Sequence, residues 1–114
     1  MLLFKPEHVS MILNQNKTET RRLWKTARVK VGNIYQCKTQ LFGKAFATVK
    51  VTGLWKENLS DISPEGVEAE GYKTIKDFMD IWIKINKSWN PNINVWVIRF
   101  DLEENLKNME VNDK

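Results

Sequence analysis

Cysteine is nearly absent from this sequence of 114 residues, since Cys37 is the only one. An internal disulfide bond is therefore excluded, which suits a reducing compartment, and we expect a cytoplasmic protein. No apolar run approaches the ~20 residues that a membrane-spanning helix needs, so we expect no partnership with a membrane. The opening residues, MLLFKPEHVS, have no basic segment, long apolar segment or small-residue cleavage site, and we expect no secretion signal.

The usual signatures of catalysis and cofactor binding are also missing. The sequence has no phosphate-binding P-loop, no glycine fingerprint for dinucleotides and no cluster of cysteine and histidine that would hold zinc, so we expect no metal and no cofactor. His8 is the only histidine, and it is expected to pack or to face solvent. Cys37 is expected to be a small buried residue of a strand.

The composition favours one globular domain. Hydrophobic residues make up 42% of the chain and tryptophan occurs five times, which is too rich for a disordered protein. The net charge is +4, and the positive charge is concentrated between residues 17 and 30, where six basic residues accompany one acid, Glu19. Such a patch could attract a phosphate backbone or an anionic ligand, although a solvated charged face is the commoner reason for one.

Hydrophobic periodicity predicts short strands with helices between them. Strands are expected at residues 2–4, 18–24, 34–42, 45–55 and 94–102, and helices at 6–14, 63–72 and 74–89. In the second strand, Thr20 and Arg22 should face opposite to Glu19 and Arg21. We therefore predict an α+β domain over residues 1–102, built on a curved sheet or small β-barrel, followed by a flexible acidic tail at 103–114.

Trp24 is the aromatic residue that the basic patch singles out. It lies among Arg21, Arg22, Lys25 and Arg28, and an aromatic ring between cations can stack on a base while the cations hold phosphate. A sheet residue packed inward would explain the same pattern equally well.

The segment NQNKTETRR at residues 14–22 resembles the signature of ASCH domains, members of the PUA-like superfamily, whose pattern is roughly G-x-K-x-x-[ET]-x-R. Lys17, Thr20 and Arg22 match it, whereas Gln15 stands where the family usually has glycine. EGY at 70–72 and VWVIRF at 95–100 resemble further segments of the family, so the similarity runs to about Leu102. The resemblance implies a PUA-like β-barrel with a cleft beside the signature loop, in a family thought to bind RNA or nucleotides.

One branch of that family, the small bacterial N4-acetylcytidine amidohydrolases, uses a lysine, a threonine and a glutamate. The resemblance implies Lys17, Thr20 and Glu70 for these roles, with Glu68 as the rival carboxylate. A threonine hydroxyl becomes a nucleophile when a base accepts its proton, and a lysine can serve if burial or nearby cations such as Arg21 or Arg22 lower its pKa.

Two other interpretations use the same residues without chemistry. In the first, Lys17 and Arg22 hold phosphate while Thr20 and Glu70 hydrogen-bond a base or sugar. In the second, Lys17 and Glu70 are an ion pair that fixes the loop. We predict the binding of RNA or a nucleoside-type ligand, with amidohydrolysis as the alternative, and the predicted ligand-binding residues are Lys17, Arg21, Arg22, Trp24 and Lys25.

Overall fold

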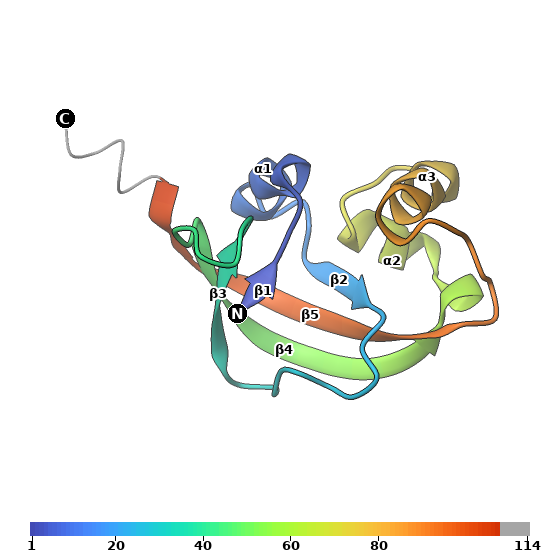
Figure 1. Ribbon diagram of the computed structural model, residues 1–114, viewed down its shortest axis with the longest axis horizontal. Helices are drawn as coiled ribbons and strands as arrows, with labels where there is room; N and C mark the ends of the chain where they lie inside the picture. The colour runs from blue at the N-terminus through green and yellow to red at the C-terminus, as the bar shows by residue number, and fades with distance from the viewer. Residues whose placement is uncertain (108–114) are drawn as a thin grey trace.

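The computed structural model describes residues 1–107, which form one curled sheet with helices over one face (Figure 1). The strands are β1 (Leu2–Leu3), β2 (Glu19–Arg22), β3 (Ile34–Lys38), β4 (Ala47–Asn58) and β5 (Asn94–Asn105). They lie in the order β1-β3-β4-β5-β2, with only the β1 and β3 pair parallel. The sheet is therefore a half-barrel whose outer strands are β1 and β2, and the predicted α+β class is confirmed.

The sheet curls because its two longest strands bend together. The register between β4 and β5 shifts between Val51 and Gly53, which marks a β-bulge or irregularity in the pairing. A side chain at Gly53 would place its Cβ 2.8 Å from the ring of Trp55, so the backbone and the indole are in close contact there. Beyond the bulge, the alternation of inward and outward residues changes phase.

The helical elements are η1 (Pro6–His8), α1 (Val9–Leu13), η2 (Leu59–Asp61), α2 (Pro64–Ala69) and α3 (Ile75–Asn86). Ser63 Oγ accepts a hydrogen bond from Gly66 N and Thr74 Oγ1 accepts one from Asp77 N, so these two side chains cap α2 and α3. Gly71 follows α2 with φ of +101°, the left-handed exit expected of it. No helix within residues 1–107 is long and apolar enough to cross a membrane.

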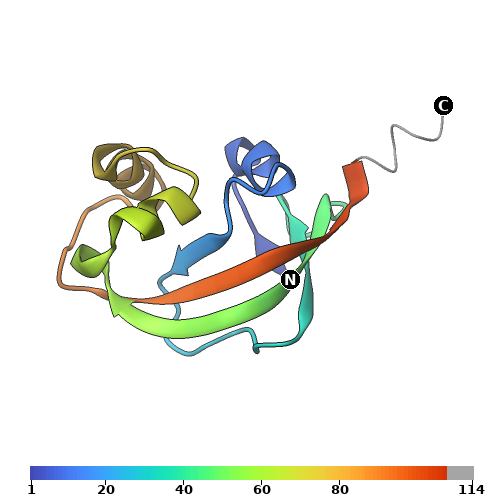
Figure 2. The same ribbon diagram turned by 180° about the vertical axis from the view of Figure 1, so that it is seen from behind.

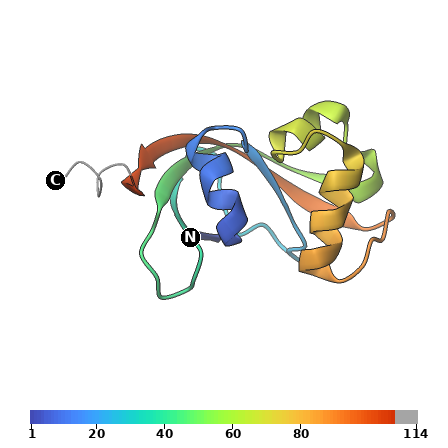
Figure 3. The same ribbon diagram turned by 90° about the horizontal axis from the view of Figure 1, so that it is seen from above.

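Two apolar clusters hold these elements together, and β5 contributes to both. The inner cluster fills the curl of the sheet beneath α1 and includes Ile98 and Phe100. The outer cluster joins α2 and α3 to the sheet and includes Val95 and Trp82. Figures 2 and 3 show α1 and α3 as separate bodies over the sheet, with β2 running between them.

Several boundaries differ from the sequence-based expectation. β3 ends at Lys38 rather than at residue 42, because residues 39–46 turn back toward β4. β5 continues to Asn105, since its last residues pair with the start of β4, and so includes the first residues of the segment expected to be a tail. Residues 106 and 107 of the expected tail are also described, and Leu106 N donates to Phe46 O, whereas residues 108–114 lie outside the described residues.

Candidate functional site

The loop between α1 and β2 carries Lys17 toward the end of α2. Gln15 adopts φ of +62°, and Lys17 N then donates to Met11 O at 3.0 Å. Thr18 N donates to Ala69 O at 2.7 Å, which joins this loop to the last turn of α2. These backbone bonds bring residues separated by about fifty positions in the chain into direct contact.

Lys17 and Glu70 form a buried ion pair at this junction. Lys17 Nζ lies 2.6 Å from Glu70 Oε1 and 3.2 Å from the Glu70 carbonyl oxygen, and only 2% of the lysine side chain is exposed. Burial lowers the pKa of Lys17, while Glu70 opposes that effect. Glu68, the rival carboxylate, is exposed and faces away, so Glu70 is the partner of Lys17.

Arg21 lies beside this pair and contacts carboxylates from three segments of the chain. Its Nη1 is 3.2 Å from Glu70 Oε2 and 3.2 Å from Glu19 Oε1, and its Nε donates to Glu57 Oε2 at 2.9 Å. Burial disfavours the guanidinium, but Glu70, Glu57 and Glu19 outweigh burial and raise the pKa of Arg21. Arg21 is therefore a fixed positive charge behind Glu70.

Arg22 joins the two outer strands of the half-barrel. Its Nε donates to Thr20 Oγ1 at 3.0 Å, its Nη2 donates to Leu3 O at 2.8 Å, and its guanidinium lies 4.8 Å from the centre of the Phe4 ring. Burial lowers the pKa of Arg22. Because arginine only donates, Thr20 accepts in this bond, and its own hydroxyl hydrogen is left to bond elsewhere. Thr20 and Arg22 share one face of β2, as predicted.

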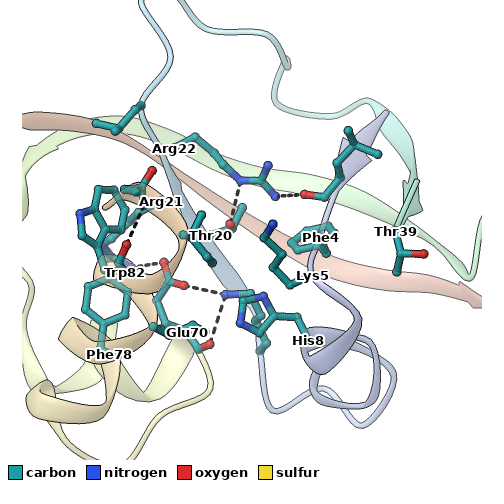
Figure 4. Close-up of a pocket in the computed structure, with 16 residues that line it drawn as sticks. Phe4, Lys5, His8, Thr20, Arg21, Arg22, Thr39, Glu70, Phe78 and Trp82 are labelled. Atoms are coloured by element: carbon teal, nitrogen blue, oxygen red, sulfur yellow. Dashed lines mark hydrogen bonds and ion pairs between the residues drawn. The ribbon is translucent and has the colours of Figure 1, made fainter. Parts of the chain in front are cut away.

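These side chains line a cavity of about 360 Å³ at the open side of the half-barrel. Figure 4 shows Thr20 and Glu70 between two aromatic walls, with Phe4 on one side and Phe78 and Trp82 on the other. The polar part of the lining consists mainly of His8, Lys17, Thr20, Arg21, Arg22 and Glu70. A flat ligand with apolar faces and a polar edge matches this arrangement.

Three aromatic residues of the lining were not expected to lie in a site. The sequence places Phe78 and Trp82 on the apolar stripe of α3, and part of that stripe does pack in the outer cluster. The same two rings and Phe4 also face the cavity. Periodicity shows which residues lie on one face of a helix but not whether the neighbouring space is filled, so no sequence signal distinguished them.

His8 also lines the cavity, where the sequence suggests packing or solvent. Its Nε2 lies 2.7 Å from the hydroxyl of Tyr72, and only 6% of the residue is exposed. Burial, and then the nearby Lys17, lower the pKa of His8 to about 4. The imidazole is therefore neutral at pH 7 and forms part of the polar wall.

Trp24 and Lys25 lie apart from the other predicted binding residues. Neither lines the cavity that holds Lys17, Arg21 and Arg22. Trp24 is half-buried against the inner cluster with the guanidinium of Arg28 5.7 Å from its ring centre, and Lys25 is exposed. The structure thus divides the predicted set of ligand-binding residues into three cavity residues and two residues on the following loop.

No model of a known protein family matches the sequence, and neither does any curated protein. The fold, however, has clear relatives. The ASCH domain of Lactobacillus crispatus superposes with a TM-score of 0.60 at 15% identity, over 82% of this chain and 69% of that one. The chain has the ASCH fold.

Two further structures show the same likeness. A protein from Enterococcus faecalis V583 superposes with a TM-score of 0.68 at 14% identity, over 92% of this chain and 72% of its own. The ASCH protein of Zymomonas mobilis superposes with a TM-score of 0.61 at 10% identity, over 91% of this chain and 66% of its own. The predicted resemblance to ASCH domains is confirmed for the fold, and at these identities the likeness extends no further than that.

Proposed function

We propose that this ASCH-type domain binds a nucleoside-like ligand in the cavity between Phe4 and Trp82. The observation that carries the proposal is the combination of aromatic walls with a buried polar floor in one cavity of about 360 Å³. That volume is near the lower end of the range for small-molecule sites and suits one nucleoside rather than a long polymer. A base on the aromatic walls would gain stacking energy, on the order of 1–3 kcal/mol.

The polar floor favours a ligand that presents hydrogen-bond acceptors. Lys17 has three N–H donors, of which Glu70 Oε1 and the Glu70 carbonyl oxygen occupy two. Thr20 Oγ1 accepts from Arg22, so its hydroxyl can donate to a ligand. Carbonyl and ring-nitrogen acceptors on one edge of a pyrimidine would meet both donors.

Isothermal titration calorimetry with cytidine, N4-acetylcytidine, adenosine and a ten-nucleotide single-stranded RNA tests this proposal. We expect a nucleoside to bind, and Trp82→Leu and Arg22→Ala to weaken that binding by about 10-fold or more. Lys25→Ala is the matched control, because Lys25 is exposed and outside the cavity. Binding of RNA alone, weakened by Lys25→Ala and unaffected by Trp82→Leu, would overturn the proposal in favour of an RNA site on the 23–33 loop.

A second candidate function is hydrolysis of an acyl-amide on such a nucleoside, as in N4-acetylcytidine. The observation that favours it is that Thr20 lines the same cavity as Lys17, a lysine whose pKa burial lowers. Thr20 Oγ would attack the acyl carbon while Lys17 accepts its proton. Lys17 would then pass that proton to the exocyclic amine as the C–N bond breaks, and water would hydrolyse the acyl-threonine.

Release of acetate from N4-acetylcytidine tests this second candidate. We expect Lys17→Ala, Thr20→Ala and Glu70→Ala each to abolish turnover, and Thr20→Ala to keep its affinity for the substrate. Glu68→Ala is the control for Glu70→Ala, since Glu68 is exposed and outside the cavity. Wild-type protein that binds N4-acetylcytidine without releasing acetate would leave binding as the function and exclude this activity.

A further inference from the structure

Arg21 occupies a position that the ASCH signature leaves open, yet it is buried and paired with carboxylates. It is 6% exposed, and its guanidinium contacts Glu19 on β2, Glu57 on β4 and Glu70 at the end of α2. We propose that Arg21 is a positioning residue, which binds one oxygen of Glu70 and so directs the other toward Lys17. The effect on ligands rests on the proposed function of the cavity, whereas the effect on Lys17 does not.

The two oxygens of Glu70 have different partners. Oε1 lies 2.6 Å from Lys17 Nζ, and Oε2 lies 3.2 Å from Arg21 Nη1. A carboxylate held at both oxygens cannot rotate without losing one charged partner. Without Arg21, Glu70 would be free to turn both oxygens toward Lys17, and the lysine would lose its defined orientation.

Arg21 can act in this way because it is itself fixed from the far side. Its Nε donates to Glu57 Oε2, and Glu19 faces its Nη1. Glu19 is held in turn by Arg99, whose Nε and Nη2 lie 3.1 and 2.9 Å from Glu19 Oε2. A continuous series of alternating charges therefore runs from Arg99 at the surface to Lys17 in the cavity.

Gly66 provides an independent sign that α2 accommodates this arginine. An alanine Cβ at position 66 would lie 2.8 Å from Arg21 Nη2 and 3.0 Å from Ile62 Cγ1. Glycine inside a helix costs roughly 1 kcal/mol relative to alanine. The helix forgoes that stability at a position where a side chain would collide with the guanidinium of Arg21.

The arrangement has an electrostatic consequence for Lys17. The charged and titratable groups that face its ammonium are Glu70 from the end of α2, Arg21 and Arg22 from β2, and His8 from η1. Arg21 contributes a positive charge and withdraws part of the Glu70 charge from Lys17. Both effects favour the neutral amine, which is the form that accepts a proton.

The experiment compares Arg21→Met and Arg21→Lys with wild type by following the pH titration of the Lys17 side chain in 13C-lysine NMR spectra. We expect Arg21→Met to raise the apparent pKa of Lys17 and to weaken nucleoside binding by about 10-fold. Arg21→Lys should keep the Lys17 titration near that of wild type, because it retains the charge. Arg28→Met is the matched control, since Arg28 is an exposed arginine that stacks on Trp24 outside the cavity.

Loss of Arg21 also leaves three carboxylates without their shared cation, so folding is checked by thermal melting. If Arg21→Met does not fold, the double variant Arg21→Met with Glu57→Gln is used, because it removes one of the unpaired carboxylates together with the arginine. A further variant, Gly66→Ala, displaces the guanidinium of Arg21 while keeping its charge. A Lys17 titration that is unchanged in the folded single or double Arg21→Met variant would overturn the inference. If wild type binds no nucleoside and the Lys17 pKa still rises in these variants, the positioning role stands and the proposed function fails.

Discussion

The inner cluster of the half-barrel and the charged layer beside it are equally buried but chemically opposite. Val49 and Ile98 in the inner cluster are completely buried among apolar neighbours. Lys17, Arg21 and Glu70 in the charged layer are only 2–6% exposed. β5 contributes Ile98 to the inner cluster and pairs with β2, which carries Arg21 of the charged layer, so the two regions lie on neighbouring strands.

The difference indicates what each region contributes. Apolar burial stabilises the fold by roughly 25 cal/mol per Å² of surface removed from water. A buried ion pair often adds nothing to the free energy of unfolding, because the cost of removing two charges from water often exceeds their attraction. Well-packed apolar residues in the same place would stabilise the fold at least as well. We infer that the charged layer serves the function of the cavity rather than the stability of the fold. The inner cluster supplies the folding free energy that offsets the cost of burying these charges.

The strongest test of this comparison removes the carboxylate that Lys17 and Arg21 share. We expect Glu70→Ala to lower the free energy of unfolding by about 3–5 kcal/mol, because Lys17 is left buried without its partner and Arg21 loses one of its three carboxylates. Urea denaturation followed by tryptophan fluorescence measures it. Glu68→Ala is the control, because Glu68 is exposed and lies two residues from Glu70 in the chain; it should change the free energy of unfolding by less than about 0.5 kcal/mol.

Phe100→Ala makes the matching change in the inner cluster and should cost a similar 3–5 kcal/mol through the cavity that it leaves. The two variants should differ in the titration of Lys17, which Glu70→Ala alters and Phe100→Ala leaves as in wild type. A loss below about 1 kcal/mol for Glu70→Ala would mean that the charged layer opens to water, and the comparison with the inner cluster would no longer hold.

A smaller effect is expected from His8, which lies at the boundary of the two regions. Its pKa falls from an ordinary 6.5 to about 4 on folding, so the unfolded chain takes up a proton at a higher pH than the folded protein. The stability contributed by the neutral imidazole is complete above pH 6.5 and is lost as the pH falls toward 4, by about 3 kcal/mol.

His8→Asn isolates this contribution from that of the carboxylates. The difference in unfolding free energy between wild type and the variant should narrow or reverse between pH 7 and pH 4, measured by urea denaturation at each pH. A constant difference over that range would show that the imidazole is as easily protonated in the folded protein as in the unfolded chain.

The sequence predicted the half-barrel well because its signals are local. Alternation along residues 94–102, the caps at Ser63 and Thr74, and the bulge at Gly53 each depend on neighbouring residues. The strand ends were less well predicted, since β5 extends to Asn105 only through pairing with β4. Pairing of that kind is a property of the folded chain.

The candidate site was predicted in part, through its motif. The resemblance placed Lys17, Thr20, Arg22 and Glu70, and these four residues line one cavity. Nothing in the sequence associated Trp82 with them, because an apolar stripe on a helix looks the same whether it faces a core or a cavity. Trp24 was included on charge and aromatic pattern alone, and the structure places it outside that cavity.

The smallest predicted effect concerns the turn that carries the chain from α1 into the charged layer. Gln15 occupies the signature's glycine position and adopts φ of +62°, a conformation that glycine enters without the steric cost paid by other residues. We expect Gln15→Gly to raise the free energy of unfolding by about 0.5–1 kcal/mol, because relief of the strain exceeds the extra flexibility of the unfolded chain. The neighbouring Asn14 has φ of −85°, so Asn14→Gly should give no gain.

Because the turn presents Lys17 through the backbone bond to Met11, the more stable Gln15→Gly variant should also leave the Lys17 titration unchanged. If Asn14→Gly stabilised the protein as much as Gln15→Gly, the gain would come from glycine at the end of a helix in general and not from relief of backbone strain at Gln15.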